Sequence, residues 1–433
     1  MHFPDFSSVE HYLDSLVNYE QAFPLGGARD RPKLAPTLAA IERLKLPLRL
    51  PQCIHIAGTK GKGSTVSFLE CLLSEGHRVL SFTSPHLMSV KERVRLNGKL
   101  LDDAVWQKGF AEIHDRLGEE PAIKLTYFES VLIFYLWAAR ELKSDVHVVE
   151  AGLGGKWDAT NVLENTLAVL TLVDYDHTEI LGNTLTEIAT DKSGIIKHAV
   201  RVVVGRQPEE ALQVYRRRIV EEQAKAHYFG ADYGWEAVED EQFRYWDNHE
   251  IIGTLRLSMP GVHQRDNAAI ALRAARLLVP DLDPQVARVQ LRQCKIPGRQ
   301  QLLAGSPDVM VDVAHNPVSF AALAATLRER YAGRRILAVV GMMKDKDAKT
   351  SLACLKGLVD ELLVVALPNP RSAKLETLRE IANSLGFNVR CPESLDRAFE
   401  ELHGKGGHDL GLVAGSFYLA GDYLRWRQRA GIA

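Results

Sequence analysis

The chain has 433 residues, and at roughly 150 residues per domain its length indicates two or three domains. Apolar residues make up 46% and charged residues 25%, the composition of a folded globular protein rather than a disordered one. With 53 Lys and Arg against 55 Asp and Glu, the formal net charge is −2, which excludes the strong positive excess of a dedicated nucleic-acid-binding protein.

The five cysteines are scattered along the chain and form no Cys-x-x-Cys pair. This pattern argues against a disulfide framework or a structural zinc site and favours a reducing compartment. The N-terminal segment lacks the basic and then apolar stretches of a secretory signal, and the longest apolar run, 131–139, is far shorter than the roughly 20 residues that span a membrane. We therefore expect a cytoplasmic protein with no membrane and no nucleic-acid partner.

Short apolar strands alternate with amphipathic helical stretches along most of the chain, which predicts βαβ units and a mainly parallel sheet. In the first part, strands are predicted at 53–57, 78–82, 146–150 and 167–173. The segment 228–258 differs, because its aromatic residues stand among acidic and polar ones. We interpret it as a small antiparallel excursion, with no function that the sequence indicates.

A helix is predicted at 267–278, and a second alternating set follows, with strands at 309–313, 335–340, 361–365 and 410–414. This second set needs a sheet of its own, so we place a domain boundary at the Pro- and Gly-containing segment 295–298. The predicted fold is α/β, with an N-terminal P-loop-type parallel-sheet ATPase domain at 1–295 and a smaller Rossmann-like α/β domain at 296–433.

Residues 58–65, with the sequence GTKGKGST, lie between a predicted strand and a predicted helix, the position of a phosphate-binding loop. Glycines let backbone N–H groups approach phosphate oxygens, and the helix N-terminus adds partial positive charge. Lys62 would meet the β- and γ-phosphates, and Ser64 or Thr65 would reach Mg²⁺. The spacing departs from GxxxxGK[ST], because Gly63 separates Lys62 from Ser64, and a glycine-rich turn with exposed lysines is the alternative. The predicted nucleotide contacts are Gly58, Thr59, Lys60, Gly61, Lys62, Gly63 and Ser64.

This loop resembles the ATP loop of the ADP-forming amide ligases that include the Mur peptidoglycan ligases and folylpolyglutamate synthase. Further stretches match the folate branch in the order of that family, from about residue 50 to residue 420. They are SPHL at 84–87 with Glu92 and Arg93, LTYFE at 125–129, EAGLGGKWDATN at 150–161, DHT at 176–178, DKSGI at 191–195, PGR at 297–299, DVAHNP at 312–317 and GSF at 415–417. The chain resembles the folylpolyglutamate synthase family, whose bacterial members are often also dihydrofolate synthases.

The resemblance implies a Mur ligase central-type domain followed by a glutamate-ligase domain, and ATP-driven amide formation. A folate-type carboxylate attacks the γ-phosphate of ATP to give an acyl phosphate, and the amino group of L-glutamate then displaces phosphate, so that ADP and phosphate are released. Phosphoryl transfer depends mainly on positioning and on neutralising charge. The metal ligands are therefore central to the expected mechanism.

Glu150 ends a predicted strand and His177 follows the next one, and ligands of open α/β sheets gather beyond the carboxyl ends of the strands. The resemblance implies that Ser84 and Glu150 hold one Mg²⁺, and that Glu150 and His177 contribute to a second. Ser64 belongs to the same metal-binding set. From the residues alone, Glu150 capping the following turn and His177 as a hydrogen-bonded loop residue are the alternatives.

Lys192 matches a lysine that this family carries in its N-carboxylated (carbamate) form, an anion able to support the second Mg²⁺. Carbamate formation requires the neutral amine, so we expect a lowered pKa for Lys192. The alternative is an ordinary lysine on the helix surface. The expected catalytic set is Lys62, Glu150, His177 and Lys192.

In the second domain, Arg299, Asp312 and His315 resemble the family's ATP-binding positions, as does Asn267 before the boundary. Arginine suits phosphates because it stays charged and presents a planar fork of donors. A strand end followed by a helix cap is the alternative for Asp312 and His315. The resemblance implies that ATP binds between the domains and that domain closure completes the site.

The stretches at 125–129 and 150–161 resemble the segments of the family that contact the pterin substrate. An aromatic side chain can stack on the flat heterocycle. From the residues alone, without the resemblance, Tyr127 and Phe128 would be assigned to the hydrophobic core. The expected substrate contacts are Thr126, Tyr127, Phe128, Glu129, Trp157, Asp158 and Ala159.

The chain departs from many bacterial members at Lys60 and at Lys156 and Trp157, and a bulky Trp157 beside Asp158 would reshape the pterin pocket. Polyglutamylation of reduced folate is expected, and conversion of dihydropteroate to dihydrofolate beside it, with a folylpolyglutamate synthase alone as the alternative. A Mur-type peptide ligase is disfavoured, because such a ligase normally carries an N-terminal UDP-binding domain, and the roughly 50 residues that precede the phosphate loop are too few for one. A non-hydrolysing nucleotide-binding protein is the remaining alternative. By analogy with the family we expect a monomer.

Overall fold

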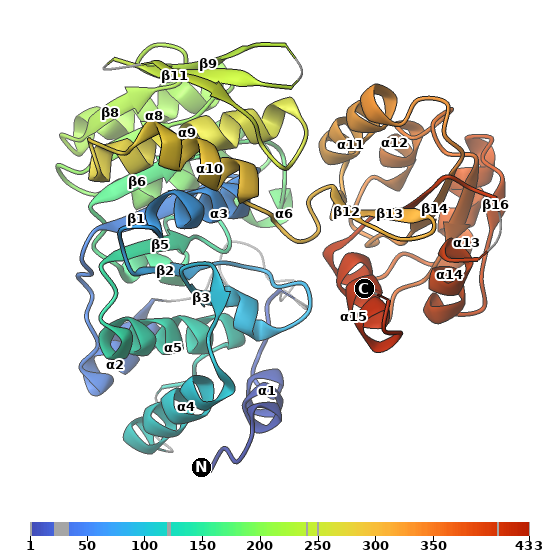
Figure 1. Ribbon diagram of the computed structural model, residues 1–433. Coiled ribbons are helices and arrows are strands. Elements are labelled where there is room, and N and C mark those ends of the chain that lie inside the picture. The colour runs from blue at the N-terminus through green and yellow to red at the C-terminus, as the bar shows by residue number, and fades with distance from the viewer. Residues whose placement is uncertain are drawn as a thin grey trace. The chain divides into compact units, whose positions relative to one another are not determined.

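The computed structural model describes residues 2–20, 34–118, 123–239, 241–248, 251–404 and 407–432. The chain forms two compact units. Unit 1 comprises Met1–His86, Val90–Ser258 and Val262–Cys294, and unit 2 comprises Leu87–Ser89, Met259–Gly261 and Lys295–Ala433. The two units share no sheet (Figure 1), and each has a hydrophobic core of its own.

Unit 1 is built on an eight-stranded sheet, counted over the described residues, with the order β4-β3-β2-β5-β1-β6-β7-β8. The six strands from β2 to β8 in this order pair in parallel, and β3 and β4 add an antiparallel edge. The strands are β1 (Cys53–Ala57), β2 (Val79–Phe82), β3 (Val94–Leu96), β4 (Lys99–Leu100), β5 (Val146–Glu150), β6 (Leu167–Leu170), β7 (Arg201–Val204) and β8 (Lys225–Tyr228).

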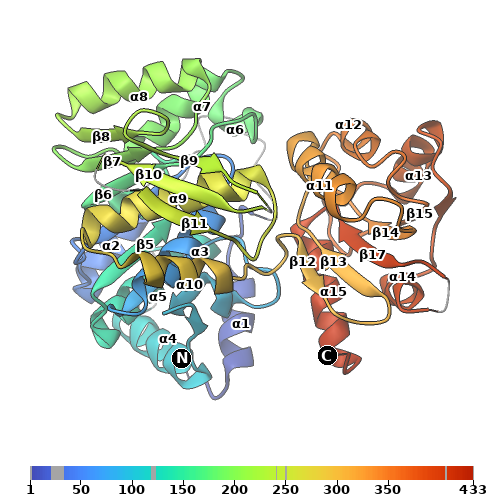
Figure 2. The ribbon, with the colours of Figure 1, turned by 45° about the horizontal axis from the view of Figure 1, so that its top comes forward.

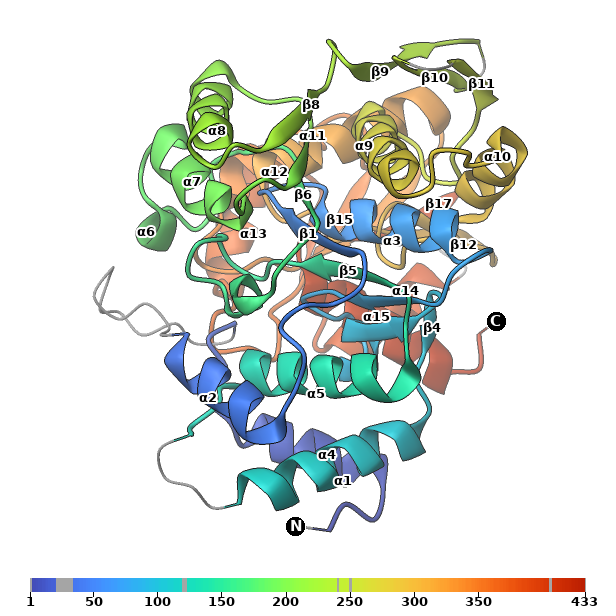
Figure 3. The ribbon, with the colours of Figure 1, turned by 90° about the vertical axis from the view of Figure 1, so that its left-hand side faces the viewer.

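Helices cover both faces of this sheet (Figure 3). On one face α3 (Lys62–Leu73) packs against α9 (Val262–Leu278) and α10 (Pro284–Gln293). On the other face lie α5 (Tyr127–Leu142), α7 (Leu185–Lys192) and α8 (Glu209–Glu221). The remaining described helices of this unit are α1 (Phe6–Asp14), α2 (Ala35–Leu44), α4 (Asp103–Leu117) and α6 (Thr178–Leu181). Because both faces are covered, the strands are apolar without alternation, as parallel strands usually are.

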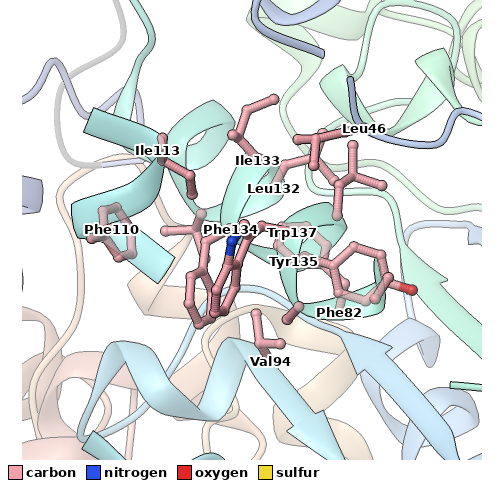
Figure 4. Packing of buried hydrophobic residues seen from close by; sticks show 14 of the residues in the cluster. Leu46, Phe82, Val94, Phe110, Ile113, Leu132, Ile133, Phe134, Tyr135 and Trp137 are labelled. Carbon is pink, nitrogen blue, oxygen red and sulfur yellow. The ribbon is translucent and has the colours of Figure 1, made fainter. Parts of the chain in front are cut away.

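The largest core of unit 1 forms around α5, the helix that contains the apolar run 131–139 (Figure 4). Phe134 of α5 stacks on Trp106 of α4, with ring centroids 4.0 Å apart. Tyr135 packs against Phe82 of β2 at 5.5 Å. A helix that is apolar on all sides is buried on all sides, so this run supplies core rather than a membrane span. No helix among the described residues is long and apolar enough to cross a membrane.

The segment predicted as an antiparallel excursion forms a three-stranded antiparallel sheet of β9 (Tyr233–Ala237), β10 (Phe243–Asp247) and β11 (Ile251–Leu255), which confirms that prediction. It packs on α9 in unit 1. The buried carboxylate of Asp247 pairs with Arg273 at 3.2 Å and Arg276 at 3.0 Å, both on α9.

Unit 2 has a six-stranded sheet with the order β12-β13-β17-β14-β15-β16, in which β12 is an antiparallel edge (Figure 2). Its strands are β12 (Gln301–Leu303), β13 (Asp308–Val311), β14 (Ile336–Val340), β15 (Glu361–Val364), β16 (Val389–Arg390) and β17 (Leu410–Ala414). One face carries α11 (Pro317–Arg330), α12 (Ala348–Ala353) and α13 (Leu375–Ser384), and the other carries α14 (Leu395–Leu402) and α15 (Phe417–Arg429).

The predicted fold class, two α/β parts with a large parallel sheet in the first, is confirmed. Most predicted boundaries differ from the observed ones by at most two residues, and two differ by more. Strand β6 ends at Leu170 instead of 173, because the carbonyl of Leu172 accepts hydrogen bonds from the phosphate loop and not from a neighbouring strand. Helix α9 begins at Val262, five residues before the predicted start.

Candidate active site

The phosphate loop, residues 58–65, joins β1 to α3 and is bound to the segment that follows β6. The backbone N–H groups of Thr59 and Lys60 donate to the carbonyl of Leu172 at 2.8 and 3.1 Å. The hydroxyl of Thr59 donates to the carbonyl of Asp174 at 3.0 Å. These hydrogen bonds hold the loop against the segment that follows β6, with its backbone leading into the N-terminus of α3, where partial positive charge favours phosphate.

Gly61 is the N-cap residue of α3 and has a left-handed backbone, with φ of 87°. A Cβ atom at this position would lie 2.2 Å from Oδ1 of Asn267, so only glycine allows this approach. Asn267 is a buried residue of α9 whose amide donates to Gln264 at 3.2 Å. The structure thus brings the predicted ATP contact Asn267 directly against the phosphate loop.

The two lysines of the loop have different partners. Lys60 forms an ion pair with Asp176 at 3.1 Å, and burial lowers the pKa of Lys60 although Asp176 opposes that shift. Nζ of Lys62 lies 3.9 Å from Oε1 of Glu150. Neither lysine is the solvent-exposed surface lysine of a plain glycine-rich turn, because their side chains are only 21% and 17% exposed.

Glu150 ends β5 and is buried, beside the first turn of α3 that contains buried Ser64. Its Oε2 accepts a hydrogen bond from the backbone N–H of Ser84, which follows β2, at 3.2 Å. Ser84, Glu150 and Lys62 therefore meet at the carboxyl edge of the sheet, as expected for a ligand site in a fold of this kind.

Glu150 and Ser84 fit a site for a divalent cation that takes most of its ligands from phosphate oxygens and water rather than from the protein. No group of three or more His, Cys, Asp or Glu side chains suited to a metal occurs among the described residues. Mg²⁺ characteristically binds one or two carboxylates and completes its shell with phosphate oxygens and water. Glu150, next to the helix N-terminus that favours phosphate, supplies such a carboxylate.

His177 lies in the segment after β6, just before α6, with a left-handed φ of 50°. Its ring nitrogens lie 4.0 Å from Asp176 and 3.9 Å from Glu179, and its side chain is 42% exposed. His177 therefore directly follows Asp176, the residue that pairs with Lys60 of the phosphate loop.

Lys192 ends α7 and is 3% exposed, which excludes the interpretation as a helix-surface lysine. Its ammonium group donates to the carbonyl of Gly58 in the phosphate loop at 2.9 Å. Burial and the nearby charge of Lys62 lower the pKa of Lys192 to about 7, against the opposing effect of Asp191, Asp176 and Asp158. A substantial fraction of the amine is thus neutral near pH 7.

The loop that follows Glu150, residues 151–158, is named here the acceptor loop. Asp158 at its end is buried; Oδ2 accepts from the N–H of Leu153 at 2.8 Å, and Oδ1 accepts from the N–H and hydroxyl of Thr160. Burial raises the pKa of Asp158. Ala159 is buried next to it, whereas the side chain of Trp157 is 42% exposed, with the ammonium group of Lys156 5.3 Å from its ring.

The first turn of α5 combines core and site positions. Thr126 and Glu129 form a reciprocal capping box, and Glu129 also accepts from the hydroxyl of Thr37 at 3.0 Å. Tyr127 is buried in the core with the guanidinium of Arg93 5.1 Å from its ring, as the core alternative predicts. The ring of Phe128 lies where a Cβ of Gly152 would be 2.7 Å away, so it contacts the acceptor loop.

In unit 2, three predicted ATP contacts gather at the carboxyl ends of β13 and β17. Asp312 accepts from the N–H groups of Gln300 at 2.8 Å and Ala314 at 2.6 Å. Burial raises the pKa of Asp312 to about 6, opposed by the charge of Arg299. The ring of Phe417 lies 5.3 Å from the guanidinium of Arg299 and 5.9 Å from the ring of His315.

Three residues that lie in the matched motifs but received no role contact predicted site residues or the core beside them: Asp176 pairs with Lys60, Arg93 lies over Tyr127, and Phe417 contacts both Arg299 and His315. Each of the three residues lies in a motif that the sequence shows. The residue that it contacts could not be predicted, because each contact joins segments that are far apart in the chain.

Two domain families match the chain: the Mur ligase middle domain over residues 56–275, and the Mur ligase, glutamate ligase domain over residues 298–417. The dihydrofolate synthase/folylpolyglutamate synthase of Bacillus subtilis is 32% identical over 90% of this chain and 94% of its own length. The solved structure of E. coli FolC in complex with DHPP and ADP has a TM-score of 0.85 at 31% identity, covering 99% of this chain and 100% of the other. A bifunctional folylpolyglutamate synthase/dihydrofolate synthase solved with Mn, AMPPNP and L-glutamate has a TM-score of 0.83 at 28% identity, with 97% of each chain covered.

The two Mur ligase domains, in this order and over this length, agree with the phosphate loop, its paired lysines and the glutamate at the end of β5. The chain belongs to the dihydrofolate synthase/folylpolyglutamate synthase family, a family of ADP-forming ligases.

Proposed function

We propose that this protein uses ATP to join L-glutamate to folate-type carboxylates, both in extending reduced folates with glutamate and in converting dihydropteroate to dihydrofolate. The observation that carries the proposal is the meeting of Lys62, Glu150 and Ser84 at the N-terminus of α3. It is supported by the relatives, one named for both activities and others solved with DHPP and ADP or with L-glutamate.

The reaction has two steps. An oxygen of the acceptor carboxylate forms a bond to the γ-phosphorus while the bond to the ADP oxygen breaks, which leaves an acyl phosphate and ADP. The amino nitrogen of L-glutamate then forms a bond to the acyl carbon, loses its proton, and phosphate leaves. In the first step, Lys62 and the N–H groups of the phosphate loop neutralise the charge on the phosphates.

Glu150 would hold a divalent cation, together with Ser84 and the first turn of α3 that contains Ser64. Such a cation would supply positive charge to the phosphate oxygens. We propose a second cation at Glu150 and His177. The exposure of His177 is compatible with this role, since its ring is not enclosed by the core.

We propose that Lys192 is carbamylated. The support is its burial beside the phosphate loop and its pKa of about 7, because CO₂ reacts with the neutral amine. The test is mass analysis of the peptide that contains Lys192 under non-acidic conditions, together with rescue of the Lys192→Ala variant by small carboxylates. An unmodified lysine that is dispensable for turnover contradicts the proposal.

We propose that Arg299, Asp312 and His315 contact ATP, and that the acceptor loop and the first turn of α5 contact the pterin. In the acceptor loop, Trp157 is the candidate for ring stacking because it is exposed, whereas both carboxylate oxygens of Asp158 already accept backbone hydrogen bonds. We further infer a protein that works in the cytoplasm, for which the five free cysteines are the support. By analogy with the family we also propose a monomer.

The experiment that tests the function is release of ADP by the purified protein with ATP, Mg²⁺ and L-glutamate. The acceptors compared are 7,8-dihydropteroate and a reduced folate, with a UDP-linked muropeptide as the control. Turnover with both folate-type acceptors is expected. Turnover with the reduced folate alone would restrict the protein to polyglutamylation, and turnover with the muropeptide alone would make it a Mur-type ligase. If the protein binds ATP but releases no ADP with any of the three acceptors, a non-catalytic nucleotide-binding protein would be favoured.

A further inference from the structure

The end of α7 touches two parts of the active site at once. Lys192 donates its hydrogen bond to Gly58 in the phosphate loop. The residue before it, Asp191, is 7% exposed and turns in the other direction, toward the acceptor loop. Its Oδ1 accepts from the N–H of Gly155 at 2.9 Å, and its backbone carbonyl accepts from the N–H of Lys156 at 2.8 Å.

Glycines allow the two segments to lie this close together. A Cβ atom at Gly154 would be 2.3 Å from Oδ1 of Asp191, and one at Gly155 would be 2.8 Å from the carbonyl oxygen of Lys192. From the other side, a Cβ at Gly194 would be 2.5 Å from Cα of Lys156. Three side-chain-free positions in one contact leave almost no room for the acceptor loop to shift against α7.

The acceptor loop is also fixed at its beginning, because it starts directly after Glu150, which accepts from Ser84 and lies near Lys62. The contact with Asp191 fixes its middle. The hydrogen bonds of Asp191 and Lys192, adjacent residues of α7, thus connect the acceptor loop to the carbonyl of Gly58.

We propose that Asp191 is a positioning residue that couples acceptor binding at the acceptor loop to nucleotide binding at the phosphate loop. Its carboxylate holds the backbone of Gly155 so that the acceptor carboxylate and the γ-phosphate are presented to each other in register. Coupling of this kind is reciprocal, so a nucleotide at the phosphate loop tightens acceptor binding and the acceptor tightens nucleotide binding. This inference rests on the proposed function of the acceptor loop.

The test measures the affinity of the full-length protein for 7,8-dihydropteroate, by calorimetry, in the presence and absence of saturating ADP and Mg²⁺. We expect the wild type to bind the acceptor about fivefold or more tightly with ADP present. In Asp191→Ala this ratio falls to about one and the KM for the acceptor rises about tenfold, while the affinity for ADP alone stays within about twofold of wild type. Asp191→Asn keeps an oxygen that accepts from Gly155 and retains the coupling.

The matched control is Thr184→Ala at the opposite end of the same helix. Thr184 caps α7 by accepting from the N–H of Glu187 at 3.2 Å, so its loss weakens the helix without touching the acceptor loop. This variant is expected to melt at a lower temperature and to keep the wild-type ratio of affinities. If Asp191→Ala fails to fold, Gly154→Ala, whose Cβ would push against the same carboxylate, takes its place.

An unchanged ratio in Asp191→Ala, a loss in Asp191→Asn equal to that in Asp191→Ala, or a loss of coupling in Thr184→Ala each overturns the inference. Absence of coupling in the wild type also overturns it. Turnover of the wild type with ATP, L-glutamate and a folate-type acceptor separates the two proposals. If the wild type turns over and the variants behave alike, only the role of Asp191 fails, whereas a wild type without turnover fails the proposed function itself.

Discussion

At the scale of single residues, the charges around the phosphate loop are paired across it. Lys60 faces Asp176, and Lys62 faces Glu150 at a distance slightly too long for a hydrogen bond. Lys62 and Glu150 therefore make no direct hydrogen bond to each other, which is compatible with the proposed roles of Lys62 toward phosphate and of Glu150 toward a cation. Removing either partner leaves the other charge partly buried, which is costly in itself.

We expect Lys62→Ala and Glu150→Ala each to lower kcat for glutamate-dependent ADP release about 10²- to 10³-fold. Lys62→Ala removes a positive charge proposed to act on the phosphates, and Glu150→Ala removes the carboxylate proposed to hold the cation that would act there. Far-ultraviolet circular dichroism of both variants should match that of the wild type. Glu150→Gln still offers an oxygen to the N–H of Ser84 but lacks the negative charge, and we expect a similar loss of kcat.

The matched control is Lys108→Ala on α4, which removes a lysine whose side chain is 67% exposed and which pairs with Glu141. Normal turnover is expected from this control. Near-normal turnover of the Lys62 or Glu150 variants would remove these residues from the proposed mechanism.

The raised pKa of Asp312 predicts a specific pH dependence of the free energy of unfolding. Its folded-state pKa of about 6 lies above the ordinary value of 3.8, so the folded protein holds this proton more tightly than the unfolded chain. The resulting stabilisation is complete below pH 3.8 and is lost as the pH rises through about 6, an effect of about 3 kcal/mol in the free energy of unfolding. Asp312→Asn does not titrate. Between about pH 3 and pH 7 the unfolding free energy of the wild type should therefore fall by about that amount relative to that of the variant, as urea denaturation at several pH values would measure. Stability curves that stay parallel over this range would contradict the prediction.

At the scale of elements, the N-terminus of α3 shows how a loop, a helix and a neighbouring helix define one site. Gly61 is left-handed and touches Asn267 of α9, so the loop, α3 and α9 form one packed layer. The start of α5 works in a similar way, since the capping box of Thr126 and Glu129 orients Phe128 toward the acceptor loop.

Gly61→Ala should therefore harm both folding and nucleotide binding. The left-handed backbone costs about 1–2 kcal/mol for any residue with a Cβ, and the contact with Asn267 adds to that cost. Gly98→Ala is the matched control, because Gly98 has a φ of 71° and open space around its missing Cβ. We expect the control to lose about 1–2 kcal/mol of stability and to bind ADP normally. Gly61→Ala should lose more stability and bind ADP at least about tenfold more weakly; equal ADP affinity in the two variants would contradict the packing of the loop on α9.

At the scale of the whole molecule, ligand binding should stabilise the folded chain. A ligand that binds only the folded state adds about 2.7 kcal/mol at a concentration of 100 times its Kd. We expect ADP with Mg²⁺ to raise the melting temperature of the wild type, Lys62→Ala to lose most of this rise, and Arg299→Ala of unit 2 to lose part of it. Differential scanning fluorimetry measures all three. A rise in Arg299→Ala equal to that of the wild type would remove Arg299 from the ATP site.

Much of the architecture could be predicted because it depends on local patterns. Strands such as β1, β5 and β17 begin and end where apolar runs begin and end, and the phosphate loop is recognisable from its glycines and lysines between a strand and a helix. The small antiparallel sheet could also be predicted from its mixed pattern. The end of β6 could not, because it depends on which carbonyl the phosphate loop uses.

The sequence by itself determined the fold class, the order of the elements and the family, because apolar periodicity and ordered motifs are properties of a linear chain. Only the tertiary structure decided which polar groups meet: Lys60 with Asp176, Lys62 with Glu150, and Lys192 with the carbonyl of Gly58, partners separated by 116, 88 and 134 positions. It also decided that Lys192 is buried and that Asp191 holds the acceptor loop. The physical reason is that burial and pairing energies depend on distance in space, which no local pattern along the chain specifies.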